Sequence, residues 1–182
     1  MKKKILIGLG IALVLVVGGL SYLKYRNSSL SPAGKAEATN SDLTVSVSYS
    51  RPSARGRVIF GTVEQKALQP YGAYWRLGAN ESTEITFNRD VLFNNEPVKA
   101  GTYKIYAIPG ADRFEIVLNS ALGTWGYSEP DHELDLLRTT LPVQHAITPA
   151  ELFTIQALSA DNGIDVNFEW ADVKVTLPVR PS

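Results

Sequence analysis

The stretch IDVNFEWADVKVTL, Ile164 to Leu177, decides the fold of this 182-residue chain. Apolar residues occupy every second position from Ile164 to Trp170, and again from Val173 to Leu177. Successive side chains of a strand point to opposite faces of its sheet, so this alternation predicts strands with one buried and one solvated face. Burial on one side only is typical of antiparallel sheets.

The same period of two recurs in Leu43 to Tyr49, Glu84 to Asn88 and Arg113 to Leu118. Turn sequences separate the runs at intervals of about ten residues. The spacing predicts an all-β domain over residues 43–182, an antiparallel β-sandwich with jelly-roll-like or barrel-like variants as alternatives. Within this domain only Pro130 to Leu137 is compatible with a short helix, and Leu134, Leu136 and Arg138 to Leu141 can equally form a strand. The turns are Asn94 to Pro97, Ala100-Gly101, Pro109 to Asp112 and Asp161 to Gly163.

Residues 1–26 have a different composition from the rest of the chain. Ile5 to Leu23 carry no charge and consist almost wholly of Ile, Leu, Val, Gly and Ala. Roughly 19 such residues can cross a bilayer as a helix, and lysines 2, 3 and 4 before them keep the N-terminus cytoplasmic. We therefore expect a single-pass anchor in the cytoplasmic membrane, with the following domain in the periplasm or on the extracellular face.

A cleaved signal peptide is the alternative for this segment. The apolar run is longer than such a peptide needs and ends in bulky and basic residues, Tyr22 to Arg26. An Ala-x-Ala site, Ala36 to Ala38, lies far beyond it, so we favour the uncleaved anchor. Asn27 to Asp42 is rich in small and polar residues without periodicity, which predicts a flexible tether over residues 27–42.

The absence of cysteine excludes disulfides, Cys-ligated zinc and acylation of a lipoprotein cysteine. The zero formal net charge conceals an asymmetry. Five basic residues lie up to Arg26, so 13 basic and 18 acidic residues remain, a net charge of about −5 for the outer domain. A net acidic domain with no basic run is poorly suited to nucleic acid or to anionic lipid headgroups.

No familiar catalytic or cofactor-binding motif occurs in the sequence, and we expect no cofactor. The two histidines, His132 and His145, lie in separate segments. Asp131, Glu133 and Asp135 surround His132, but a solvated acidic turn explains them better than a metal site, and we expect no metal.

Arginines and aromatic residues crowd around one turn, PYGAYWRLGANE, Pro70 to Glu81. One interpretation is structural: Arg51 and Arg76 clamp loops, and Arg76 pairs with Glu81, because an unpaired buried charge is costly. The other is a pocket for an anionic or polyhydroxyl ligand, in which the guanidinium groups bind it and aromatic rings form flat walls. The candidate binding residues are Arg51, Arg57, Tyr71, Trp75, Arg76, Asn80, Glu81 and Trp125, the last from a second aromatic loop that also contains Tyr127.

Several segments, in order from about Leu43 to Leu177, resemble a bacterial family named domain of unknown function 2911. The most specific is WRLGANE, Trp75 to Glu81, although members usually have threonine where this chain has Leu77. The resemblance implies an exported β-rich domain and supplies no activity, substrate or catalytic residue. The other segments are YSRPS (49–53), GRVIFG (56–61), PYG (70–72), AGTY (100–103) and IPG (108–110).

We therefore expect a membrane-anchored, exported β-sandwich with a non-catalytic role in the cell envelope, either structural or in binding a glycan, a peptide or another protein. The alternative from another class is a hydrolase of an envelope polymer. Glu81 would then be the acid/base, with Asp131 or Glu133 as the second carboxylate and Arg76 tuning the pair.

Overall fold

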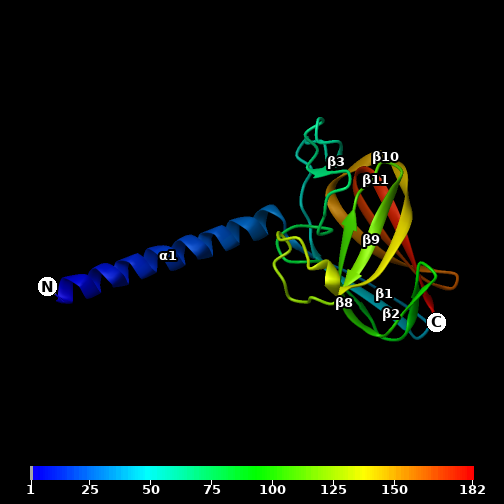
Figure 1. Cartoon of the computed structure of the whole chain (residues 1–182), viewed down its shortest axis with the longest axis horizontal. Coiled ribbons are helices and arrows are strands. Elements are labelled where there is room, and N and C mark those ends of the chain that lie inside the picture. The colour runs from blue at the N-terminus through cyan, green and yellow to red at the C-terminus, as the bar shows by residue number, and fades with distance from the viewer. Residues whose placement is uncertain (1) are drawn as a thin grey trace.

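The computed structural model describes residues 2–182, with side chains from residue 7 onward. One long helix, α1 (Lys2–Leu30), projects from a domain of antiparallel strands (Figure 1). The strands are β1 (Ala33–Asn40), β2 (Leu43–Ser50), β3 (Phe60–Gly61), β4 (Gln69–Pro70), β5 (Glu84–Phe87), β6 (Val91–Phe93), β7 (Glu96–Val98), β8 (Gly101–Ile108), β9 (Arg113–Asn119), β10 (Asp135–Ala160) and β11 (Gly163–Pro181), with a 3-10 turn, η1 (His132–Leu134), before β10.

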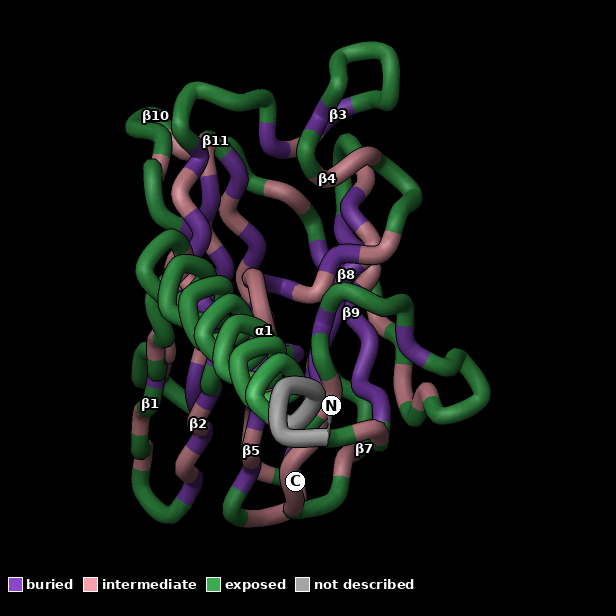
Figure 2. Tube along the Cα trace, turned by 90° about the vertical axis from the view of Figure 1, so that its left-hand side faces the viewer, coloured by how far each residue is buried: buried purple, intermediate pink, exposed green. Residues whose placement is uncertain are grey.

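Helix α1 contains the predicted apolar segment. Its stretch Ile7–Leu30, 24 residues with a mean hydropathy of 1.9, is long and apolar enough to cross a membrane. None of this stretch is buried against the β domain, as Figure 2 shows along the whole visible helix. Pro32 follows two residues after Leu30, where proline commonly ends a helix.

The prediction of a flexible tether over Asn27 to Asp42 is wrong. Residues up to Leu30 continue α1, and β1 pairs antiparallel with β2 along its whole length, from Ala33 opposite Ser50 to Asn40 opposite Leu43. Residues of low strand propensity hide this strand in the sequence, and pairing with β2 holds it in place. The Asn40 amide also donates hydrogen bonds to the carbonyl groups of Ala160 (2.7 Å) and Gly163 (2.8 Å).

Nine strands form one sheet in the order β1-β2-β5-β8-β9-β10-β11-β6-β7, and β3 and β4 form a small parallel pair. The long strand β10 folds this sheet over: Asp135–Pro142 pair with β9, whereas residues 154–160 pair with the start of β11. Register shifts between His145 and Thr154 mark the bend. The sheet is open, with β1 and β7 at its edges, and its two halves enclose the core. The predicted all-β antiparallel class is confirmed.

Aromatic residues fill the centre of the core. Trp75 stacks on Trp170 with ring centroids 5.9 Å apart, and Phe60, Phe114 and Phe153 contact them edge-on or tilted. Trp75 is only 2% exposed, and its backbone pairs with Ala107 of β8. The prediction of Trp75 as a wall of a binding site is therefore wrong: its side chain belongs to the core.

The predicted turn at Asp161 to Gly163 joins β10 to β11, and Gly163 has φ +133°. A Cβ at this position would overlap the carbonyl oxygen of Val179 on the far end of the same strand. Glycine is therefore required for both conformation and space.

We expect Gly163→Ala to lower the free energy of unfolding by about 3 kcal/mol, through backbone strain and the clash together. Gly72→Ala is the control, because Gly72 also has positive φ (+78°) but open space around it. It should cost only about 1 kcal/mol. Urea denaturation of the full chain in detergent measures both, and equal losses would contradict the steric part of the argument.

Candidate functional site

A cavity of about 260 Å³ lies where α1 meets the β domain. The end of the helix at Leu30, the loop after β2 and the turn after Trp75 surround it, and Trp170 lines it from the core. Three of its lining residues are arginines, Arg55, Arg57 and Arg76, and none is acidic. We call this cavity the arginine pocket.

The three guanidinium groups have no carboxylate partner within ion-pair distance among the residues that the structure describes. Arg57 donates hydrogen bonds to the carbonyl oxygens of Ala54 (Nε, 3.0 Å) and Ser53 (Nη2, 2.7 Å). The nearby carboxylate of Glu151 accepts from the Ser53 hydroxyl and the Arg55 backbone amide instead. The arginine side chains thus keep donors available for a ligand.

Arg76 is held without an anion. Its Nη1 donates to the carbonyl oxygen of Asn80 (3.3 Å), and its guanidinium lies over the Tyr127 ring, 5.5 Å from the centroid. Burial lowers the pKa of Arg76 below its ordinary value, because the neighbouring Tyr74 and Tyr127 only partly offset the lost hydration. A half-buried cation in this state gains from any anion that enters the pocket.

Backbone strain accompanies this arrangement. Leu77 and Asn80 have φ of +51° and +58°, and Gly78 between them has φ +151°. Leu77 is fully buried, and a Cβ at Gly78 would lie 2.8 Å from the carbonyl oxygen of Ser50. Strain at a bulky residue persists only where packing enforces it, and it concentrates at functional sites. The strained turn forms one side of the arginine pocket.

Trp170, which lines the pocket, has an indole N–H group that makes no hydrogen bond within the described chain. Trp170 is 1% exposed, and its indole Nε1 is buried without a hydrogen-bond partner in the described chain, as is that of Trp75. Buried polar groups are almost always hydrogen-bonded, so these exceptions need an explanation. Trp170 lines the arginine pocket and Trp75 does not, and both indole nitrogens are buried.

The eight candidate residues of the sequence analysis lie in five different places, one of which is the core that contains Trp75. Arg57 and Arg76 line the arginine pocket. Arg51 lies apart and ties the end of β2 to β10, through Nη2 to the Thr154 hydroxyl (3.1 Å), as the clamp interpretation predicts. Tyr71 lies on the surface and is 38% exposed. Arg55 and Trp170 also line the arginine pocket but were not among the predicted binding residues. The spacing of Arg55 and Arg57 on either side of Gly56 could have indicated that both arginines belong to one site.

Asn80, Glu81 and Trp125 line a second cavity, of about 430 Å³, together with residues of α1. Trp125 is 53% exposed and forms an isolated bridge with Glu81. No ion pair joins Arg76 to Glu81, so the predicted clamp between them is wrong. The turn at Leu77 to Asn80 directs the Asn80 carbonyl, rather than the Glu81 carboxylate, toward Arg76.

The predicted second carboxylates are separate from Glu81. Glu81 lines two cavities, and neither includes Asp131 or Glu133. The Asp131 side chain instead accepts a hydrogen bond from the Glu133 amide (3.0 Å) and caps η1. Among the described residues, no group of three histidine, aspartate or glutamate side chains could hold a metal.

Asp135 is the centre of a polar network beneath the loop 120–131. The sequence had instead predicted that Asp135 belongs to a solvated acidic turn. Its side chain is only 7% exposed. It accepts hydrogen bonds from the Tyr106 hydroxyl (2.8 Å), Arg138 Nη2 (2.6 Å) and the Asn119 amide (2.9 Å). Burial raises the pKa of Asp135, but these hydrogen bonds outweigh burial, and the pKa lies below its ordinary value.

We expect Asp135→Asn to lower the free energy of unfolding at pH 7 by about 2 kcal/mol, because the buried donors of Tyr106 and Asn119 lose a charged acceptor. A lowered pKa contributes stability above the unfolded value, about 3.9, and that stability is lost as pH falls through the folded value. The difference between parent and variant should therefore shrink in acid. Chemical denaturation at pH 7 and pH 3 measures it, with exposed Glu133→Gln as the control. A difference independent of pH would contradict the assignment.

No curated protein and no solved structure matches this sequence. The sequence model of one family, described as "Protein of unknown function (DUF2911)", matches residues 31–179, from the end of α1 to the end of β11. This range covers the arginine pocket, its strained turn and the polar network. The chain therefore belongs to the DUF2911 family of proteins of unknown function.

Proposed function

We propose that this protein is a membrane-anchored binding module whose β domain holds a small anionic group in the arginine pocket. The observation that carries the proposal is the composition of that pocket: three guanidinium groups without carboxylate partners, and no acidic lining residue. Guanidinium forks bind phosphate, sulfate and carboxylate through paired, charge-assisted hydrogen bonds.

The size of the pocket supports a compact ligand. Its volume, about 260 Å³, lies just below the roughly 300–1,000 Å³ of pockets for drug-sized molecules. A phosphate, sulfate or carboxylate group, together with a small part of the envelope glycan, peptide or lipid that carries it, would fit this volume. The domain as a whole is net acidic, so the attraction is local to the pocket and should weaken as salt is added.

The proposed location is the outer side of the cytoplasmic membrane, with α1 as an uncleaved anchor. The three lysines before the apolar segment favour a cytoplasmic N-terminus. Strand β1 supports the uncleaved form, because cleavage after Ala38 would remove most of a strand that pairs with β2 and would leave the edge of β2 uncovered.

Isothermal titration of the full chain in detergent with inorganic phosphate and sulfate tests the pocket. We expect Arg55→Gln and Arg76→Gln each to weaken anion binding at least tenfold, since each removes a charge from the site. Arg113→Gln is the control, because Arg113 is exposed on β9 and does not line the pocket. Equal affinity in all three variants, or no anion binding by the parent, would disprove the proposal.

Membrane extraction tests the anchor separately. The protein should stay with membranes in high salt and in carbonate, and protease added from outside should cut the exposed domain. Recovery of a soluble form beginning near Thr39 would instead establish a cleaved signal peptide.

A further inference from the structure

The loop 120–131, between β9 and η1, has an unusual surface. Its large apolar side chains Leu122, Trp125 and Tyr127 are 46%, 53% and 75% exposed, and we call these three residues the aromatic rim. Buried Gly126 lies among them. Three exposed apolar side chains within six positions form a patch that calls for a partner, because single exposed residues are common but clusters are not.

The rim is fixed in place rather than a loose loop. The Thr124 carbonyl accepts from the Ser82 amide (3.1 Å), the Gly126 amide donates to the Asn80 carbonyl (3.0 Å), and the Tyr74 hydroxyl donates to the Gly126 carbonyl (3.1 Å). The small residues of the loop thus satisfy its backbone against the domain, while its large residues face outward. Such preorganisation reduces the entropy that docking would cost.

The rim lies beside the C-terminal end of α1, just beyond Leu23, where the apolar segment of the helix ends. Trp125 lines a cavity with Lys24, Asn27 and Ser28 of α1, and the loop (yellow in Figure 1) faces the side from which α1 emerges. At 1.5 Å per residue, residues 24–28 lie about 2–8 Å beyond Leu23 along the helix. The polar layer on each side of a bilayer is about 5–8 Å thick. Trp125 is therefore at the depth of the headgroups when the uncharged segment that ends at Leu23 spans the hydrocarbon core.

We infer that the aromatic rim docks into the headgroup layer of the same membrane that α1 crosses. The inference rests on the membrane anchor of the proposed function, but not on anion binding. Tryptophan and tyrosine are enriched at this depth, where the ring meets apolar surface and its polar atom meets water. On α1, Tyr22 and Tyr25 are 64% and 71% exposed at the same level, and Lys24 and Arg26 supply positive charge for lipid phosphates.

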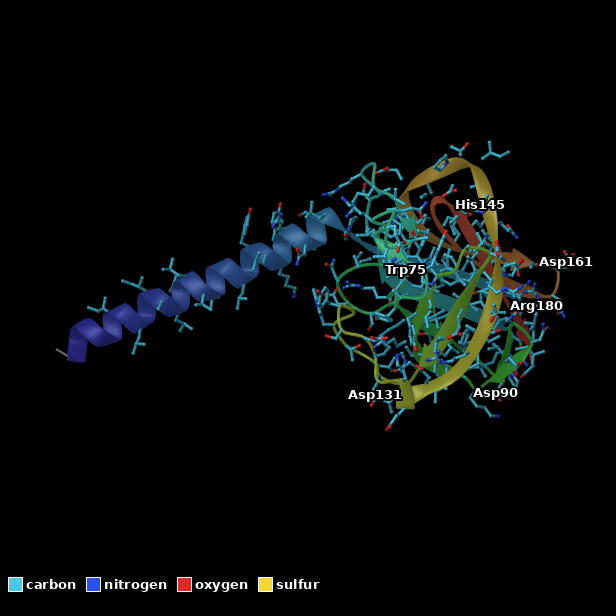
Figure 3. The ribbon with its side chains drawn as sticks, turned by 45° about the horizontal axis from the view of Figure 1, so that its top comes forward. Trp75, Asp90, Asp131, His145, Asp161 and Arg180 are labelled. Carbon is cyan, nitrogen blue, oxygen red and sulfur yellow. The ribbon has the colours of Figure 1, made fainter. Side chains whose placement is uncertain are left out.

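Docking would hold the domain against the bilayer at two points, the helix and the rim. A protein or glycan partner on the rim would have to displace lipid headgroups, because the end of the apolar helix is adjacent. The β10–β11 turn at Asp161 lies on the side of the domain away from α1 (Figure 3). We therefore expect that end of the domain not to contact the membrane.

Tryptophan fluorescence tests the inference directly. The chain has three tryptophans, and Trp75 and Trp170 are buried, so Trp125 alone is exposed to a quencher. We would place the full chain in nanodiscs of phosphatidylcholine and phosphatidylglycerol, with lipid brominated near the top of the acyl chains. Brominated lipid should reduce the emission of the parent, and Trp125→Phe should lose most of this reduction.

A tryptophan introduced on the side of the domain away from α1 provides the matched control. Leu158 is 49% exposed, close to the exposure of Trp125, and lies near the β10–β11 turn. Leu158→Trp in the Trp125→Phe background should not be quenched by the lipid. Equal quenching of this variant and the parent would overturn the inference, because it would show that quenching does not depend on position.

Two further outcomes overturn the inference and separate it from the proposed function. If the chain enters nanodiscs but Trp125 is unquenched by lipid and open to acrylamide, the rim is free for another partner and the anchor stands. If the chain fails to enter nanodiscs, both the anchor and the docking are wrong. Anion binding in the arginine pocket is measured in detergent and is independent of either result.

Discussion

The stacking of Trp75 on Trp170 determines where the charged residues of this domain can lie. Adjacent residues of an extended segment point to opposite faces, so the burial of Trp75 forces Arg76 out of the core. The same Trp170 forms the floor of the arginine pocket. Core packing thus places a cation and an unused indole donor beside one cavity, and the rigidity of a packed core keeps them there.

Two polar side chains on the outer face of β8, Lys104 and Tyr106, bind the loop 120–131 and the polar network around Asp135. Lys104, only 2% exposed, donates a hydrogen bond to the Thr124 hydroxyl (3.1 Å), and Tyr106 from the same strand binds Asp135. These contacts hold the loop 120–131 from below, and the loop in turn places Tyr127 over Arg76. The polar network therefore links the aromatic rim to the arginine pocket through a short chain of contacts.

Periodicity predicted β2, β9 and β11, because apolar residues alternate along each of them in the sequence, and the turn at Asp161 to Gly163 followed from its composition. It could not predict β1, whose residues have little strand preference and depend on pairing with β2. Alternation placed Trp75 and Arg76 on opposite faces of the segment, but it did not show that the face of Trp75 is buried in the core. The Arg76–Glu81 pair failed because positive φ at Leu77 and Asn80 turns the chain in a way that residue types do not reveal.

The distribution of ion pairs explains how a basic pocket exists on an acidic domain. Elsewhere, Arg89 pairs with Asp42 and Arg180 with Asp165, and the carboxylates are used where strands meet. The lining of the arginine pocket includes no carboxylate, and the nearby Glu151 binds the Ser53 hydroxyl and the Arg55 backbone amide rather than a guanidinium group. Leaving Arg76 half-buried without an anion costs stability. The proposed ligand, which would supply the missing negative charge, accounts for this arrangement beside a strained turn better than structure alone does.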